Sequence, residues 1–79
     1  MKVKDVLAVK GSNVIVINHE KTIFEAMSMF AMHRVGSLLI VDEMKDIVGI
    51  IAARDVLMEV LRASEKIRET PVNSIMTRN

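Results

Sequence analysis

Asp55 is the acidic residue best placed to do chemistry, because it falls in the first turn of a predicted helix that directly follows a buried strand. The apolar run at residues 47–51 leads through Ala52, Ala53 and Arg54 into that helix. The first N–H groups of a helix have no intrahelical partners and carry partial positive charge, so they attract anions. This strand-to-helix junction therefore predicts an anion-binding position.

Neither a catalytic set nor a metal site can be assembled from the sequence. The two histidines, His19 and His33, show no metal-ligand spacing and no companion acids, so both are interpreted as non-metal residues. No Ser-His-Asp set, no Cys-His pair and no paired carboxylates of a cleft are apparent. The chain is therefore not expected to be an enzyme. Asp55 also has a structural alternative, as a first-turn acid that favours the helix macrodipole.

Three apolar runs predict the strands that position this junction. The β-branched run at residues 14–17 is typical of a strand buried on both faces. The runs at residues 37–41 and 47–51 flank a polar turn at residues 42–46 and predict a hairpin.

The first helix is predicted from its start and stop signals. Thr22 and Glu25 have the spacing of a capping box, and Gly36 is a candidate C′ residue after His33 and Arg34. Because a helix here connects two strands with short loops, a right-handed βαβ unit is expected. The apolar stripe of this helix comprises Ile23, Ala26, Met27, Phe30 and Ala31.

The second helix is predicted over residues 53–66, before Pro71 ends the helical region. Its apolar stripe comprises Val56, Leu57, Val60 and Leu61. Three methionines on the two helices, Met29, Met32 and Met58, fill gaps in the core or form a helix-to-helix dimer face, and we favour the dimer face.

Composition limits the class of protein. The 79 residues suffice for one small domain, and a hydrophobic content of 51% with only two aromatic residues favours burial against a partner. A net charge of +1 without a basic block argues against nucleic-acid binding. There is no cysteine, no signal-peptide pattern and no apolar run of membrane-spanning length, so a soluble cytoplasmic protein without membrane contact is expected.

Taken together, the order of elements and several short motifs resemble a CBS domain, the nucleotide-sensing module named after cystathionine β-synthase. The resemblance covers roughly residues 2–63. It implies an α/β (α+β-like) fold with a β-α-β-β-α unit, in which two helices pack on one face of a small three-stranded sheet. The matching motifs are Val3-x-Asp5-Val6-Leu7, Thr22-x-x-Glu25-Ala26, residues 33–36, residues 39–43, and residues 47–51 leading to Arg54-Asp55.

Residues 1–70 are thus expected to form one CBS repeat. Residues 72–77 repeat the apolar-polar pattern of residues 3–8, so residues 71–79 are interpreted as a linker or the opening of a following repeat. Family members usually carry paired repeats, which implies a homodimer or pairing with a second repeat through the helices. The chain is then either a natural single repeat or a fragment of a longer protein.

The resemblance also implies an adenosyl ligand, such as AMP, ADP, ATP or S-adenosylmethionine, in a cleft between two repeats, with no required cofactor. Asp55 matches the family acid that accepts hydrogen bonds from the ribose. The adenine and ribose side would comprise Asn13, Val14, Ile15, Val35, Gly36, Ser37 and Asp55. The phosphate side would comprise His33, Arg34, Ala52 and Arg54.

One departure weakens this expectation. The family ligand motif is Ser/Thr-x-x-Asp, whereas this chain has Ala52 in place of the hydroxyl residue three positions before Asp55. Ala at a helix N-cap costs about 0.5–2 kcal/mol relative to Ser or Thr. The alternative function is therefore a purely structural dimerisation module that binds no nucleotide.

Overall fold

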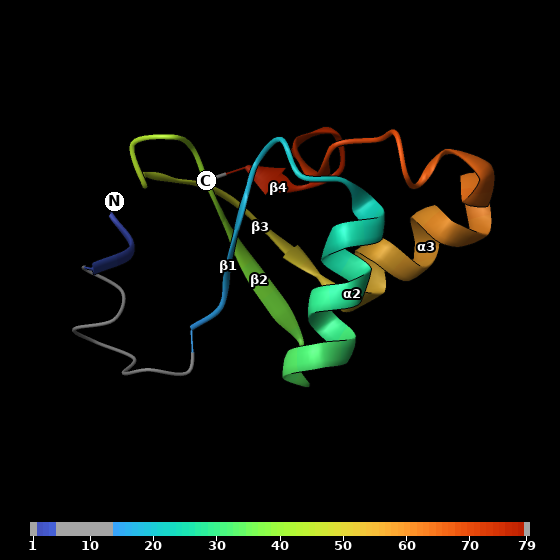
Figure 1. Cartoon of the computed structure of the whole chain (residues 1–79), viewed down its shortest axis with the longest axis horizontal. Coiled ribbons are helices and arrows are strands. Elements are labelled where there is room, and N and C mark those ends of the chain that lie inside the picture. Colours follow the sequence, from blue (N-terminus) through green and yellow to red (C-terminus); the bar gives the residue numbers. More distant parts are fainter. Residues whose placement is uncertain (1, 5–13, 79) are drawn as a thin grey trace.

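The computed structural model describes residues 2–4 and 14–78 of the chain. Residues 5–13, including Asn13, lie outside this described part. Within it the predicted order of strand, helix, strand, strand and helix is present, and Figure 1 shows the arrangement. The elements are β1 (Val16–Asn18), α2 (Ile23–His33), β2 (Ser37–Val41), β3 (Ile47–Ala52), α3 (Ala53–Ala63), the 3-10 turns η2 (Ser64–Lys66) and η3 (Val72–Ser74), and β4 (Thr77–Arg78).

In the described residues, four strands form one sheet in the order β1-β2-β3-β4. β1 and β2 are parallel and are joined through α2, the kind of crossover that a parallel pair requires, whereas the β2–β3 and β3–β4 pairs are antiparallel. The β2–β3 turn is held by Asp42, whose Oδ1 accepts hydrogen bonds from the backbone amides of Met44 and Asp46. The predicted hairpin is confirmed, but the predicted number of three strands is wrong, because Thr77–Arg78 adds a short fourth strand along β3.

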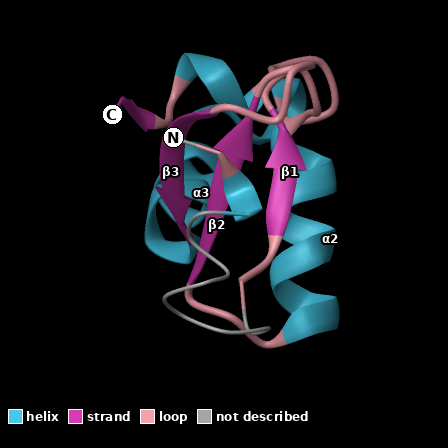
Figure 2. Cartoon of the chain, turned by 90° about the vertical axis from the view of Figure 1, so that its left-hand side faces the viewer, coloured by secondary structure: helices cyan, strands magenta, loops and turns pink. Residues whose placement is uncertain are grey.

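Both long helices pack on the same face of the sheet, as predicted (Figures 1 and 2). Alternate residues of β2, Leu38 and Ile40, are completely buried beneath them. The core between sheet and helices comprises Ile17, Ile23, Ala26, Leu38, Ile40, Ile51, Val56 and Val72.

α2 begins with the predicted capping box. The Thr22 hydroxyl accepts a hydrogen bond from the Glu25 amide at 3.2 Å, and the Glu25 carboxylate accepts one from the Thr22 amide at 3.0 Å. The predicted C′ role of Gly36 is wrong. The chain leaves the helix two residues earlier, because Arg34 takes the left-handed conformation with φ of 55°. The Arg34 amide donates a hydrogen bond to Phe30 O at 3.1 Å.

The apolar stripe predicted for α3 is divided between two environments. Val56 is buried and Val60 packs against the core, whereas Leu57 and Leu61 are exposed. Glu59, which lies between Leu57 and Leu61 in the sequence, is also buried, and the guanidinium of Arg62 donates hydrogen bonds to its carboxylate. The true α-helix ends at Ala63 and continues as η2 to Lys66, the predicted end.

Two further predictions for α2 and its methionines need correction. Ala31, predicted in the α2 stripe, is exposed because α2 turns that side away from the sheet. Met29, favoured as a dimer-face residue, is partly buried against the core, whereas Met32 and Met58 are exposed.

Residues 70–78 pack back onto the domain. Thr70 O accepts a hydrogen bond from the Ile23 amide at 2.8 Å, and the Val72 amide donates to Lys21 O at 2.7 Å. Val72 is completely buried in the core. The segment therefore covers the start of α2 before it joins the sheet as β4.

Candidate functional site

Three connections meet at one end of the sheet. The segment entering β1 carries Val14 and Ile15, and the Ile15 carbonyl accepts a hydrogen bond from the amide of Leu39 in β2 at 3.0 Å. The α2–β2 connection carries Gly36, whose carbonyl accepts a hydrogen bond from the amide of Ala53 at 3.0 Å. The β-α-β-β-α order thus brings sequence-distant candidates for ligand binding side by side.

The β3–α3 junction closes this end of the sheet. Ser37, the first residue of β2, pairs with Ala52, the last residue of β3. Arg54 and Asp55 follow in the first turn of α3. Asn13 lies outside the described residues, and the structure places the remaining predicted site residues on or beside these three connections. Their assignment to a ligand stays a prediction.

The N-terminus of α3 lacks a side-chain cap. Ala52 has the extended backbone of an N-cap residue, with φ of −96° and ψ of 155°, but its methyl group can accept no hydrogen bond. The carboxylate of Asp55 instead accepts a hydrogen bond from the Ala52 amide at 3.0 Å. Because the Ala53 amide is bound to Gly36, the amides of Arg54 and Asp55 are the donors of this turn that can face an anion.

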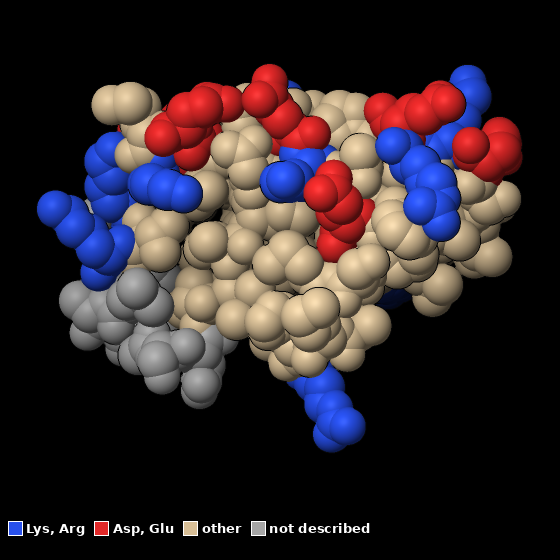
Figure 3. All heavy atoms as spheres, viewed as in Figure 1, with Lys and Arg blue, Asp and Glu red and all other residues tan. Residues whose placement is uncertain are grey.

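Basic side chains flank the same end. His33 is the last residue of α2 and Arg34 follows it, and both are exposed, as is Arg54 in α3. Elsewhere the charges are mixed: on the face shown in Figure 3, Lys and Arg alternate with Asp and Glu, beside a broad uncharged area. The described residues on that face form no continuous basic field of the kind that nucleic acids require.

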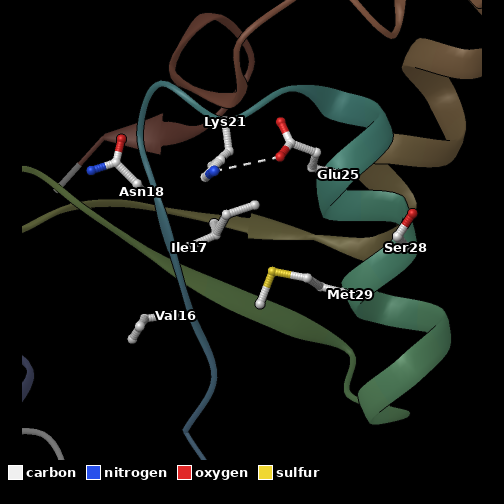
Figure 4. A pocket seen from close by; sticks show the side chains of 7 residues that line it. All are labelled: Val16, Ile17, Asn18, Lys21, Glu25, Ser28 and Met29. Carbon is white, nitrogen blue, oxygen red and sulfur yellow. Dashed lines mark ion pairs between the residues drawn. The ribbon is translucent and has the colours of Figure 1, made fainter.

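An open groove of about 370 Å³ lies elsewhere, between β1 and α2. Its walls include Ile17 and Met29, and Figure 4 shows Lys21 directed toward Glu25 at its rim, where their charged groups are 3.6 Å apart. None of the predicted adenosine or phosphate residues in the described part of the chain, which excludes Asn13, lines this groove. It therefore does not belong to the candidate ligand site.

The structure also assembles a cluster that sequence reasoning missed. His19 Nε2 lies 2.9 Å from Glu43 Oε1, and one ligand atom each from His19, Glu20 and Glu43 lies within 4.8 Å of the others. The hydrogen bond with His19 lowers the pKa of the Glu43 carboxyl below its ordinary value of 4.5. The available signal was topological, since His19 and Glu43 each follow the end of a predicted strand in a parallel pair.

Comparison with known proteins places the fold among well-described domains. A family model described as CBS domain matches residues 3–62. The CBS domain-containing protein CBSCBSPB1 of Arabidopsis thaliana is 32% identical over 68 residues, which cover 86% of this chain and 12% of that protein. An uncharacterized 17.7 kDa protein of Acidianus ambivalens is 35% identical over 68 residues, covering 86% of this chain and 40% of that protein.

Solved structures agree with this fold. A CBS-domain-containing protein of Agrobacterium tumefaciens superimposes with a TM-score of 0.78 at 28% identity, covering 98% of this chain and 57% of that one. A cystathionine beta-synthase domain protein fused to a Zn-ribbon-like domain superimposes with a TM-score of 0.73 at 27% identity, covering 84% of this chain and 93% of that one. In most of these matches the chain corresponds to part of a longer protein.

Proposed function

The chain belongs to the CBS domain family, with one repeat matched over residues 3–62, and on this premise we propose that it is a regulatory module that binds an adenosyl ligand. CBS domains are generally regulatory and pair with another CBS domain. We propose AMP, ADP, ATP or S-adenosylmethionine as the ligand, without a required cofactor or a catalytic role, and a cytoplasmic location. No helix in residues 2–4 and 14–78 combines the length and apolar character needed to span a membrane.

One observation carries the proposal: the segment entering β1, the α2–β2 connection and the β3–α3 junction, where α3 begins, share one end of the sheet. The Gly36–Ala53 hydrogen bond and the Ser37–Ala52 pair fix these connections relative to each other. In the proposed complex the adenosine lies against Val14, Ile15 and the residues from Val35 to Ser37. The phosphates then face the α3 amides and the basic side chains of His33, Arg34 and Arg54.

The exposed apolar side chains of the helices suit pairing with a second repeat. Leu57 and Met58 are each 57% exposed, and Leu61 and Met32 are 74% and 73% exposed. Leu57 and Leu61 are four residues apart, so they lie on one side of α3. We propose that this helical face pairs with a second CBS repeat, either in a homodimer or in a longer chain.

Pairing gives the ligand a mechanism. One repeat supplies one wall of the proposed cleft, and the partner repeat supplies the other. A ligand that contacts both walls stabilises one relative orientation, by no more than the difference in its affinity for the two orientations. That change in orientation would be passed to an attached domain or a partner protein.

A purely structural dimerisation module is the second candidate, and two features of α3 favour it. Ala52 supplies no hydroxyl for a phosphate, and Asp55 already accepts a hydrogen bond from the Ala52 amide without any ligand. In this alternative, Asp55 serves helix stability alone and the helical face carries the whole function.

Calorimetric titration with AMP, ATP and S-adenosylmethionine separates the two candidates. Saturable heat with at least one ligand is expected, and Asp55→Ala should weaken the affinity about tenfold or more, because hydrogen bonds to a charged group contribute about 1.5–3 kcal/mol. Glu69→Ala, an exposed acid in the loop after η2, is the matched control and should leave the affinity unchanged. Absence of heat at high micromolar ligand, with pairing intact, would favour the structural module.

A further inference from the structure

The His19, Glu20 and Glu43 cluster lies at the end of the sheet opposite to the proposed ligand site. His19 and Glu20 directly follow β1, and Glu43 follows β2 after one residue. Because β1 and β2 are parallel, their carboxyl ends share one edge of the sheet. The amino ends of the same strands lie beside the residues proposed to hold the adenosine. The cluster is therefore independent of that site.

Hydrogen bonds of their backbone groups hold His19 and Glu20 in place. The His19 amide donates a hydrogen bond to Val41 O in β2 at 2.9 Å, and His19 O accepts one from the Asn73 amide at 3.2 Å. The Glu20 amide donates to the Asn18 side-chain oxygen at 2.9 Å. The positions of His19 and Glu20 are thus fixed by the sheet and by η3.

The imidazole has its two nitrogens in different surroundings. Nε2 faces the Glu43 carboxylate, while Nδ1 lies 3.5 Å from the side-chain amide of Asn73. The oxygen and nitrogen of a side-chain amide can exchange places by a turn of the amide group, so Asn73 can present its oxygen and accept a hydrogen bond from Nδ1–H. Protein metal sites commonly fix a ligating imidazole by this kind of contact to its second nitrogen.

The spacing of the three donors fits a small divalent cation. In tetrahedral zinc sites with bonds near 2.0–2.2 Å, ligand atoms lie about 3.3 Å apart. His19 Nε2 and Glu43 Oε1 are 2.9 Å apart, and the three ligand atoms all lie within 4.8 Å of one another. The ligand-to-ligand distance of a zinc site falls between these two values. One imidazole with two carboxylates is a donor set that zinc accepts, and the exposure of Glu20 and Glu43 leaves room for water as a further ligand.

We propose that His19 Nε2 and the carboxylates of Glu20 and Glu43 form a binding site for a divalent transition-metal cation of the zinc type. The cation replaces the direct hydrogen bond between His19 and Glu43 and balances the two carboxylate charges. By joining the segment after β1 to the β2–β3 turn, it also links two connections of the sheet.

Titration of the tag-free full chain with Zn²⁺ in a non-coordinating buffer, without nucleotide, tests the site. One equivalent should bind saturably and raise the melting temperature. His19→Gln and Glu43→Gln should each abolish or strongly weaken binding, whereas the exposed-acid control Glu69→Gln should not. Because Glu43 is an exposed turn residue, its variant keeps the test valid even if His19→Gln unfolds.

Asn73→Ala provides the sharper readout. Loss of an outer partner of a ligating histidine typically weakens metal affinity 10–100-fold, so a decrease of that size is expected with the circular dichroism spectrum unchanged. Absence of saturable Zn²⁺ binding, or binding that survives both His19→Gln and Glu43→Gln, would overturn the proposal. Either result leaves the nucleotide titration unaffected, because the two sites lie at opposite ends of the sheet.

Discussion

The Oδ2 atom of Asp55 accepts a hydrogen bond from the backbone amide of Ala52 at 3.0 Å, which closes one half of a capping box at the start of α3. The other half is missing, because Ala52 has no side-chain oxygen to accept from the first-turn amides. The contact holds this turn in place and leaves the second carboxylate oxygen, Oδ1, for the hydrogen bond that we propose it accepts from a ribose hydroxyl. The capping contact is therefore compatible with the proposed ligand-binding role of Asp55.

Ala52→Ser should complete this capping box. The extended backbone of Ala52 already matches an N-cap residue, so the new hydroxyl can accept a first-turn N–H without rearrangement. The free energy of unfolding should rise by about 0.5–2 kcal/mol, measured by urea denaturation. Ala53→Ser, one residue inside the helix, is the matched control. An equal gain in both variants, or none in Ala52→Ser, contradicts the capping argument.

Gly49→Ala should disturb the β3–β4 contact. A Cβ atom at Gly49 would lie 2.6 Å from Met76 Sδ and 2.8 Å from the Thr77 backbone oxygen, so the chain at β4 must move. We expect a loss of about 1–3 kcal/mol in unfolding free energy, typical of overpacking, and faster amide exchange in β4.

Gly36→Ala is the matched control for this change, because a Cβ there meets no atom of the described residues within 4 Å. It should be neutral or slightly stabilising. Equal losses of stability in the two glycine variants would show that the close approach of Met76 and Thr77 is not the cause.

Leu61→Glu should disrupt pairing. Leu61 is 74% exposed on α3, and a charge there would be buried without a partner in a helix-to-helix interface. Sedimentation velocity should detect an assembled form of the wild-type chain and a monomer of the variant. Met44→Glu, equally exposed at 71% but on the β2–β3 turn, should leave assembly unchanged. A wild-type chain that stays monomeric at all concentrations contradicts the proposed homodimer.

The capping box of α2 predicts a specific pH dependence. The hydrogen bond from the Thr22 backbone lowers the pKa of Glu25 below its ordinary value of 4.5, so the ionised form is favoured in the folded state. This contribution is fully present above the unfolded pKa and is lost as pH falls through the lower folded pKa. Wild type and Glu25→Gln should therefore differ most near neutral pH and converge in acid, as measured by chemical denaturation. A constant difference across this range contradicts the assignment.

Local signals in the sequence were sufficient for most elements of the fold. The Thr22–Glu25 spacing predicted the start of α2, and the apolar runs predicted β2 and β3, because capping and strand burial depend on neighbouring residues. The strand β4 was missed, since two residues carry no periodicity and their pairing depends on where η3 places them. Gly36 was misinterpreted because Arg34, an unusual residue for a left-handed backbone, ends the helix first.

The candidate sites were predictable to different degrees. The grouping of Gly36, Ser37 and Asp55 follows from the family order of elements. The division of the α3 stripe was not predictable, because burial of Glu59 depends on its side chain reaching Arg62 at the surface. The cluster of His19 with Glu43 joins residues 24 positions apart, and only the parallel pairing of β1 and β2 brings them together.

Amide chemical-shift mapping of the chain during titration with AMP tests both the ligand and its site. Saturable shifts are expected at Gly36, Ser37 and the first turn of α3, with smaller shifts at the end of α2. Shifts confined to other surfaces, such as the His19 end of the sheet, would contradict the site. No shifts at saturating AMP, ATP and S-adenosylmethionine would contradict the ligand-binding function itself.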